Sequence, residues 1–557
     1  VQATSLTSDG FTIKDNLAKV DFTAVTVGGS SIDLVASASM INCGTTISTP
    51  IAGPCIVAID QPTLDVVNNG TITNNFGNSV VVYSGSISGY INNQGALIAS
   101  TAGVYFSAGA TLSGGITNGG LISGSSLGIR LSAAKLDGGI NNSGTIIGGS
   151  AGIYLNSGSK LSGGINNSGL ISGGYIGIAT NSSSLITGGI TNTGTIVARS
   201  AGISFNSGST LSGGINNSGS ISGGYVGIAA NSSSLITGGI TNSGTISAVY
   251  AAGIGLNYRS QISGGINNSG LISSGNNGIY ISSGAILSGG INNTGTIAGG
   301  TAGIYLSSGT LSGGINNSGV ISGSVGGGIV NYGGTISGDI AILNNGLGTI
   351  IGGIQNSGLI TGNTGAIINN GINVLDVNNQ QYGTIVGAIN GVVNVTNSGL
   401  FALQQMSGQH IEQGSTVASS IGGSYYQASP GTLQLGVAGT LAGNYSQLSV
   451  SGAAQFDANT NLRVSVASAS AISSGDTLAA VVSTGSPSNF TSDGFTIKDN
   501  LANIVFTAST ASGGQLDLLA LTDPNNCGSI VNTSTNGPCY VAIDQTTLDV
   551  ANTGTIT

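Results

Sequence analysis

Two pairs of cysteines are the residues whose chemistry is easiest to recognise in this chain. Cys43 is followed by Cys55, and Cys527 by Cys539, so the two residues of each pair are twelve positions apart. Paired cysteines at equal local spacing predict two local disulfides and an oxidising compartment. The alternative is four free thiols in a buried core. A zinc site is not expected, because His410 is the only histidine and the two pairs lie far apart in the sequence.

The carboxylates are too sparse to predict a catalytic pair. Hydrolysis of a glycosidic bond needs two carboxyl groups about 5–9.5 Å apart. Within the repeats described below, the acidic residues are Asp137, Asp339 and Asp376, and the first two stand about eight repeats apart. At about 4.8 Å per stacked strand, that separation is about 40 Å. Asp60 and Asp65 are closer to each other but flank a joint, where we expect solvated or capping carboxylates.

The single histidine forms the other candidate group for proton transfer. His410 and Glu412 alternate along a glutamine-rich segment, so both side chains are expected on one strand face. No serine or cysteine motif accompanies them, and we expect an exposed pair. The glycine-rich turns lack both a phosphate-binding GxxxxGK[ST] motif and the aspartates of calcium-binding β-rolls. The sequence therefore predicts no catalytic, cofactor or metal site, and a protein that is not an enzyme.

A repeat of about 25 residues must position all of these groups. One clean copy reads GGINNSGTIIGGSAGIYLNSGSKLS, from Gly138 to Ser162. Successive copies of its Asn-x-Gly step are 24 to 26 residues apart, at Asn68, Asn93, Asn118, Asn142, Asn167, Asn192, Asn217, Asn242, Asn268, Asn293 and Asn317. A fixed period of this length is typical of a solenoid, in which each repeat buries its apolar face by stacking on its neighbours.

The composition of the repeat favours strands over helices. Glycine, serine, threonine and asparagine fill it, helix formers are rare, and short apolar pieces alternate with turn residues. We therefore predict an all-β chain, a right-handed parallel β-helix with about three short strands per coil. Ile and Leu recur in four columns, which start at Ile140, Ile146, Ile153 and Leu161. The asparagines from Asn142 to Asn317 are predicted to form a stacked ladder joined by amide hydrogen bonds.

Charge and hydropathy limit the classes of partner. Only 5% of the residues are charged, the net charge is −9, and the nine basic residues are scattered, so binding of nucleic acid is not expected. No apolar run is long enough for a transmembrane segment. The remaining candidates are surfaces. Tyr105, Tyr154, Tyr280 and Tyr305 are predicted to point outward, either as a strip that stacks on sugars or as ordinary cross-strand packing.

A second, longer period encloses the first. SDGFTIKDNLA occurs at residues 8–18 and again at residues 492–502, and the last 73 of the 557 residues align without gaps on the first 73 at an offset of 484. We interpret the chain as one large unit with its overlap into the next. The expected parts are the end of a preceding cap (1–36), a joint with one cysteine pair (37–67), the β-helix (68–401), a β-rich C-terminal cap (402–523), and a joint with the first coil of the next unit (524–557).

The predicted cap carries a resemblance to a known family. Its segments TLQL (432–435), YSQLSV (445–450) and SGDTL (474–478) follow the β-helix in the order seen at the C-terminal end of autotransporter passengers, so the chain resembles a pertactin-like β-helix with its cap. The resemblance implies export by type V secretion to the surface of a Gram-negative bacterium. That family places a membrane barrel after the cap, whereas here a new joint begins at Asp523. The difference favours a giant tandem passenger or a filament.

These observations together predict a structural extracellular protein. We expect a rigid β-helical rod of tandem units at the bacterial surface, in which neighbouring units of the same protein are the partners, end to end. The alternative is an autotransporter-type adhesin that binds glycans or other cells. A β-helix enzyme acting on polysaccharides ranks third.

Overall fold

The computed structural model describes residues 18–27, 31–43, 46–47, 57–59, 65–82, 85–347, 349–372, 374–458, 460–468, 471–486, 488, 495–501, 504–511, 514–523, 530–531 and 551–552. These residues form strands and turns without any helix, and they contain about 16 turns of a parallel β-solenoid with about 25 residues per turn. The predicted all-β solenoid is thus confirmed. The chain divides into two units, Val1–Asn276 and Asn277–Thr557.

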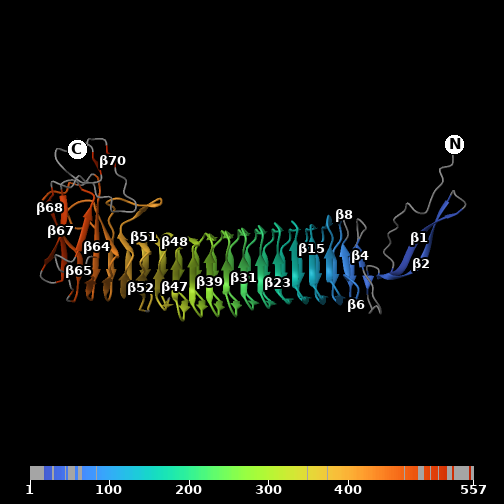
Figure 1. Cartoon of the computed structure of the whole chain (residues 1–557). Helices are drawn as coiled ribbons and strands as arrows, with labels where there is room; N and C mark the ends of the chain where they lie inside the picture. The colour runs from blue at the N-terminus through green and yellow to red at the C-terminus, as the bar shows by residue number, and fades with distance from the viewer. Residues whose placement is uncertain are drawn as a thin grey trace. The chain divides into compact units, whose positions relative to one another are not determined.

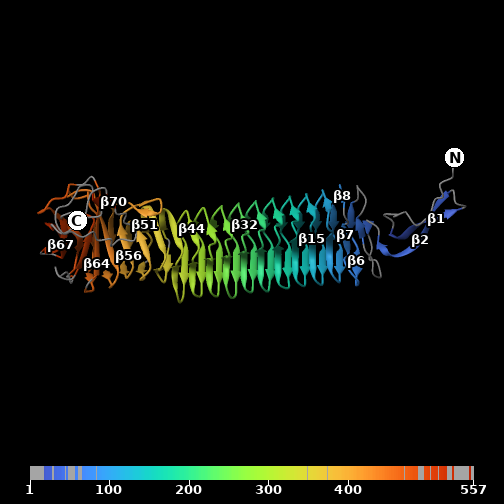
Figure 2. The ribbon, with the colours of Figure 1, turned by 45° about the horizontal axis from the view of Figure 1, so that its top comes forward.

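In the first unit, each turn contributes strands to four parallel stacks, of which stacks 1 and 4 belong to one sheet. Figure 1 and Figure 2 show these strands repeating from turn to turn. Stack 1 contains β3(Thr46–Ile47), β5(Val66–Asn68), β9(Ile91–Asn93), β13(Ile116–Asn118), β17(Ile140–Asn142), β21(Ile165–Asn167), β25(Ile190–Asn192), β29(Ile215–Asn217), β33(Ile240–Asn242) and β37(Ile266–Asn268). Stack 2 contains β6(Thr71–Asn74), β10(Ala96–Ala99), β14(Leu121–Gly124), β18(Thr145–Gly148), β22(Leu170–Gly173), β26(Thr195–Ala198), β30(Ser220–Gly223), β34(Thr245–Ala248) and β38(Leu271–Ser274).

The other two stacks close the turn. Stack 3 contains β4(Val57–Ile59), β7(Val80–Val82), β11(Ala102–Phe106), β15(Leu127–Ser132), β19(Ala151–Asn156), β23(Ile176–Thr180), β27(Ala201–Phe205), β31(Val226–Ala230) and β35(Ala252–Leu256). Stack 4 contains β8(Gly85–Ile87), β12(Ala110–Leu112), β16(Lys135–Leu136), β20(Lys160–Leu161), β24(Leu185–Ile186), β28(Thr210–Leu211), β32(Leu235–Ile236) and β36(Gln261–Ile262). An antiparallel pair, β1(Ala18–Val27) with β2(Ser31–Cys43), precedes the turns.

The turn has one more strand than the three predicted, because a glycine corner splits the last piece. In the turn from β20 to β21, Gly164 has a φ of +74°, which glycine adopts at little cost. A Cβ at that position would lie 2.7 Å from the backbone of Gly188 in the next turn. The corner glycines therefore lie so close between successive turns that no larger residue fits.

The core of each turn consists of the four predicted aliphatic columns. They start at Ile140, Ile146, Ile153 and Leu161, and no member of any of them is more than 2% exposed. Within the first unit the register is strict, since Ile140 pairs with Ile165 and Ile165 with Ile190. At about 1.5–3 kcal/mol for each fully buried side chain, these columns are a large favourable term in folding.

The second unit begins with regular turns and then changes. Its strands are β39(Asn277–Ser282), β40(Ile286–Leu287), β41(Ile291–Asn293), β42(Thr296–Gly299), β43(Ala302–Ser307), β44(Thr310–Ser312), β45(Ile315–Asn317), β46(Val320–Gly323), β47(Gly327–Tyr332), β48(Thr335–Asn344), β49(Thr349–Ile351), β50(Ile354–Asn356), β51(Leu359–Asn369), β52(Asp376–Asn379), β53(Thr384–Val386), β54(Ile389–Val392), β55(Asn394–Asn397), β56(Leu400–Leu403), β57(Met406–Ser407), β58(His410–Ile411), β59(Ala418–Ile421), β60(Tyr425–Gln427), β61(Thr432–Val437), β62(Gln447–Val450), β63(Ala454–Phe456), β64(Thr460–Val466), β65(Thr477–Thr484), β66(Phe495–Asp499), β67(Ile504–Ala511), β68(Gln515–Thr522), β69(Ile530–Val531) and β70(Ala551–Asn552). In β48 and β51 the pieces that formed stacks 4 and 1 merge into single long strands.

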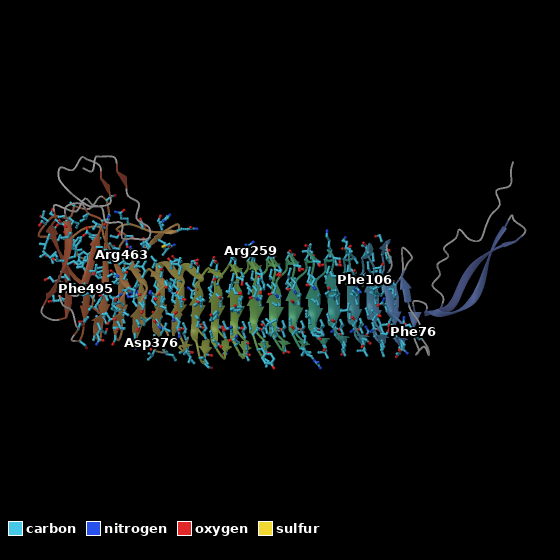
Figure 3. The ribbon with its side chains drawn as sticks, viewed as in Figure 1. Phe76, Phe106, Arg259, Asp376, Arg463 and Phe495 are labelled. Atoms are coloured by element: carbon cyan, nitrogen blue, oxygen red, sulfur yellow. The ribbon has the colours of Figure 1, made fainter. Side chains whose placement is uncertain are left out.

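Parallel stacking continues into the segment predicted as the cap. β61 pairs in parallel with β56 on one side and β64 on the other, and β64 pairs in parallel with β66. Aromatic contacts accompany this region, with ring centroids 5.6 Å apart for Tyr425 and Phe456 and 5.1 Å apart for Phe456 and Phe495. Phe495 is labelled in Figure 3. Antiparallel pairing dominates only at the end, where β68 lies between β65 and β67.

Candidate functional site

Buried asparagine side chains form a ladder along stack 1 of the first unit. Asn142 Nδ2 donates to Asn167 Oδ1 at 2.7 Å and also to the carbonyl oxygens of Gly144 and Leu170. Equivalent side-chain bonds of 2.6 to 2.8 Å join every neighbouring pair in the series Asn68, Asn93, Asn118, Asn142, Asn167, Asn192, Asn217, Asn242 and Asn268. None of these residues is more than 2% exposed. Each amide thus ties one turn both to itself and to the next.

The same ladder position is occupied in the second unit. Asn293 donates to Asn317 at 2.7 Å, Asn317 to Asn344 at 2.8 Å, and Asn344 to Asn369 at 2.7 Å. Asn369 Nδ2 then donates to the carbonyl oxygen of Gly391 at 3.0 Å. The amide series therefore ends on a backbone group, and all eight asparagines predicted between Asn142 and Asn317 lie at inward ladder positions within their units.

A second ladder, on a different face, corrects one interpretation of the sequence. Asn331 follows Asn317 by only 14 residues in the sequence, which suggests a shortened turn, but Asn331 lies in β47, where it pairs with Leu306 of β43. The next member of the first ladder is Asn344. The second ladder runs with side-chain bonds of 2.7 to 2.9 Å through Asn331, Asn356, Asn379, Asn397 and Gln427. In the second unit, the inward column that is apolar at Ile281 and Leu306 is thus polar from Asn331 on.

Each ladder has a direction, since every amide donates toward the later turn. The first member consequently keeps a buried acceptor without a partner among the described residues, as seen for Asn68 Oδ1 and Asn331 Oδ1. In both places the preceding residue in register is aliphatic, Ile47 and Leu306. The first residue of each ladder is therefore incompletely hydrogen-bonded. The hydrogen bonds along the rest of the ladder must offset the free-energy cost of this buried, unpaired acceptor.

The outward side of the same strands carries a second polar array, which we term the polar face. Its members are neutral and exposed. They are Thr117, Asn141, Asn166, Thr191, Asn216, Thr241 and Asn267 in one row, and Ser143, Ser168, Thr193, Ser218, Ser243 and Ser269 in the other. Thr191 and Asn192 are adjacent in one strand, so the strand alternation alone separates the exposed row from the buried ladder.

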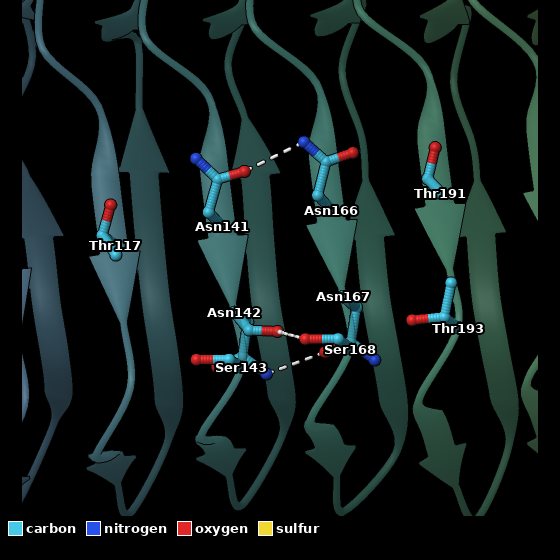
Figure 4. A pocket seen from close by; sticks show the side chains of 9 residues that line it. All are labelled: Thr117, Asn141, Asn142, Ser143, Asn166, Asn167, Ser168, Thr191 and Thr193. Atoms are coloured by element: carbon cyan, nitrogen blue, oxygen red, sulfur yellow. Dashed lines mark hydrogen bonds between the residues drawn. The ribbon is translucent and has the colours of Figure 1, made fainter.

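An open groove of about 260 Å³ lies on the polar face, lined by Thr117, Asn141, Asn142, Ser143, Asn166, Asn167, Ser168, Thr191 and Thr193. Figure 4 shows the outward side chains standing in rows across neighbouring strands. Asn166 Nδ2 donates to Asn141 Oδ1 at 2.9 Å, and the Ser143 and Ser168 hydroxyls donate to backbone carbonyls of ladder asparagines at 3.4 Å. The groove offers hydrogen-bond donors and acceptors at regular spacing, without charge.

The carboxylates considered for catalysis are each engaged by a separate neighbour. Asp137 forms an ion pair with Lys135 at 2.9 Å. Thr364 donates to Asp339 at 2.6 Å, and Asn394 donates to Asp376 at 2.9 Å; Asp376 is visible on β52 in Figure 3. Asp65 accepts from the Tyr90 backbone N–H at 3.2 Å, whereas Asp60 lies outside the described residues. The structure does not bring any two of these carboxylates together in one described site.

The histidine and glutamate lie in an exposed hairpin. His410 is in β58, which pairs antiparallel with β57, and Glu412 follows directly; both side chains are exposed. The Glu412 backbone carbonyl accepts a hydrogen bond from Gln404 Nε2 at 2.8 Å. Among the described residues, no group of His, Cys, Asp and Glu side chains is arranged to hold a metal ion.

The four tyrosines predicted to point outward are half-buried. Tyr105 and Tyr154 pack over a cluster that includes Leu127 and Ala151, and Arg130 lies 5.2 Å from the centroid of the Tyr105 ring. Tyr280 and Tyr305 contact each other with centroids 5.7 Å apart, and burial raises the pKa of Tyr305. These observations favour cross-strand packing over an open stacking surface.

Sequence reasoning missed several tyrosines that are exposed, among them three at corners of the first unit. Tyr175, Tyr225 and Tyr250 are 60% to 68% exposed at the turns between stacks 2 and 3. The first two each follow a Gly-Gly turn, which is the signal that places a side chain at a corner instead of on a strand face.

The cysteine pairing stays a prediction. Cys55, Cys527 and Cys539 lie outside the described residues, and for Cys43 only the backbone, at the end of β2, is described. Mass spectrometry of unreduced peptides would reveal whether Cys43 is linked to Cys55 and Cys527 to Cys539.

No protein-family model matches the chain, and no curated protein is significantly similar to it. Nor do the described residues include a helix of the length and hydropathy needed to cross a membrane.

Proposed function

We propose that this protein is a structural component of the bacterial surface, an extracellular β-helical rod or filament built from tandem units. The observation that carries the proposal is the regular repetition of the buried side chains from turn to turn. In each unit the aliphatic columns are 0–2% exposed and the ladder amides 0–6% exposed, turn after turn. Such order gives every turn the same rigid support, which a scaffold needs over its whole length.

The longer period supports assembly from units. The offset of 484 residues repeats whole segments of the cap and joint, so the sequence provides for one unit to follow another. The resemblance to autotransporter passengers supports export to the cell surface, and the stacked pairings of β56, β61 and β64 are compatible with a capped β-helix.

The experiment that tests the proposal is surface labelling combined with gene deletion. Antibodies against the regular turns should label intact cells of the source bacterium, and the deletion strain should lose surface fibres or the layer that they form. Label confined to lysed cells, or unchanged surface structures in the deletion strain, would contradict a structural surface role.

A second candidate function is adhesion to glycans, and the groove on the polar face favours it. Rows of neutral hydroxyl and amide groups match the hydrogen-bonding needs of sugar hydroxyls. A glycan array probed with the intact chain, and with a variant that carries Asn141→Ala and Asn166→Ala, tests this reading. Specific binding that the variant loses would support adhesion, and release of sugars from the array would instead indicate an enzyme.

A further inference from the structure

The corner between stacks 2 and 3 carries large side chains over four consecutive turns of the first unit. Each of these turns presents one or two of them to solvent, and they are Tyr175, Arg199, Tyr225, Val249 and Tyr250. In the two preceding turns the corner consists of serine and glycine (125–126 and 149–150), and in the following turn of glycine and asparagine (275–276). The large exposed side chains are therefore confined to one place, between turns whose corners carry short side chains.

The backbone places two of the tyrosines in one column, two turns apart. The Ser200 N–H donates to the Tyr175 carbonyl oxygen at 2.9 Å, and the Tyr225 N–H donates to the Ser200 carbonyl oxygen at 2.9 Å. Stacked strands are about 4.8 Å apart, so the backbones of Tyr175 and Tyr225 are about 9.6 Å apart. In the following turn the Ala251 N–H donates to the Tyr225 carbonyl oxygen at 2.9 Å, which brings Tyr250 beside this column.

Arg199 lies in the turn between these two tyrosines. The neighbouring turns carry glycine at its position, Gly174 and Gly224, so no side chain of this column lies beside its guanidinium group. Arg199 forms no ion pair within the part of the chain that the structure describes. No aspartate or glutamate occurs in the sequence between Asp137 and Asp339, and Asp137 already has an ion pair of its own. The positive charge of Arg199 is thus available to a ligand.

We propose that this corner binds a linear acidic glycan in which uronic acids alternate with neutral sugars. The inference goes beyond the structural role and concerns a surface other than the polar face. A sugar unit of an extended glycan is about as long as one strand spacing, so successive sugars match successive turns. The rings of Tyr175 and Tyr225 stack on the faces of two neutral sugars, and Arg199 donates two parallel hydrogen bonds to the carboxylate of the uronic acid between them.

The size and charge of this corner favour a glycan over a protein or a nucleic acid. The four turns span about 15 Å, and the corner is one or two side chains wide, which is much less than the roughly 800 Å² that each partner buries in a stable protein interface. Single-stranded nucleic acid also stacks on aromatic rings, but it carries a phosphate on every unit, and the net charge of the chain is −9. An alternating glycan instead places a single negative charge opposite Arg199.

The test measures the binding of hyaluronan oligosaccharides, in which glucuronate alternates with N-acetylglucosamine, to the full chain by isothermal titration calorimetry. We expect saturable binding that is weakened at least about tenfold in Arg199→Gln, and to the same extent in the double variant Tyr175→Ala/Tyr225→Ala. Chitin oligosaccharides of the same length lack the carboxylate and should bind the original chain at least about tenfold more weakly. All substituted side chains are exposed, and circular dichroism should show that both variants keep the fold.

Two control variants locate the site. Arg259→Gln removes another exposed arginine, which follows the exposed Tyr258 at the corner between stacks 3 and 4 and is labelled in Figure 3. This variant and the polar-face variant Asn141→Ala/Asn166→Ala should bind hyaluronan as tightly as the original chain. An equal loss in Arg259→Gln would indicate an unspecific effect of charge, and a loss in the polar-face variant would assign the glycan to the groove. Either result, binding of oligothymidylate with similar affinity, or the absence of hyaluronan binding would overturn the proposal.

Discussion

Asn141 and Asn142 are neighbours in one strand, yet their side chains lie in different environments. Asn142 is 2% exposed and bonded to Asn167 of the next turn, whereas Asn141 is exposed on the polar face. The same contrast separates Gly164, enclosed by the next turn, from Gly158, which has open space around it. The comparison shows that the stacking of turns restricts which residue types fit at positions enclosed between turns. Exposed positions on the outer surface tolerate a wider range of residue types.

The largest effect is expected at the glycine corner. Gly164→Ala adds a Cβ that would lie 2.7 Å from the Gly188 backbone, at a φ of +74°. Steric overlap and backbone strain together should lower the free energy of unfolding by about 3 kcal/mol or more. Gly158→Ala is the matched control, because Gly158 has a φ of +73° but an added Cβ would have no neighbouring atom within 4 Å. This variant should lower the free energy of unfolding by about 1 kcal/mol. Urea unfolding followed by circular dichroism measures both, and equal losses would refute the role of close stacking.

The next effect concerns the inward ladder. Asn167→Ala removes the acceptor for Asn142 Nδ2 and the donor to Asn192 Oδ1, both in a buried position. We expect a loss of about 2–3 kcal/mol, because a buried acceptor is left unpaired. Asn166→Ala, one residue earlier on the polar face, should change the stability by about 0.5 kcal/mol or less. A similar loss of stability in both variants would contradict the distinction between the buried ladder and the exposed polar face.

A smaller effect is expected for the aromatic side chains. Tyr154→Ala removes a ring that packs over the outer cluster of stack 3, and it should cost about 1–2 kcal/mol. Tyr175→Ala, at a position 66% exposed, should cost about 0.5 kcal/mol or less. Thermal unfolding of the two variants tests the pair, and a larger loss for Tyr175→Ala would show that the exposed corner has a packing role.

The regular turns are predictable from the sequence because every turn repeats the same physical problem. The column that starts at Ile146 and the asparagines at 24- to 26-residue spacing specify which side chains face inward, and those positions are buried as expected. The glycine corner is less predictable, since a strand break depends on backbone conformation. Only the positive φ of Gly164 shows why one apolar piece becomes two strands.

The irregular turns are not predictable in the same way. An Asn-x-Gly step marks a ladder member but does not specify its face, so the short step to Asn331 suggests a shortened turn although Asn331 starts the second ladder. The outward direction of Tyr154 is predictable because it follows an inward isoleucine. The sequence leaves open whether its ring is exposed or packed, and in the structure neighbouring outer side chains cover it. The groove on the polar face has no signal of its own beyond the alternation that places Asn166 outside.

The central claim, a rigid filament of end-to-end units, is tested most directly by electron microscopy of native surface material. About 16 turns per chain at about 4.8 Å each give about 75 Å before the cap is added, so we expect a fixed axial repeat of about 80–100 Å. Images that show such a repeat along straight filaments would support the account. Units that tumble independently like beads, or a repeat far below about 60 Å, would contradict it.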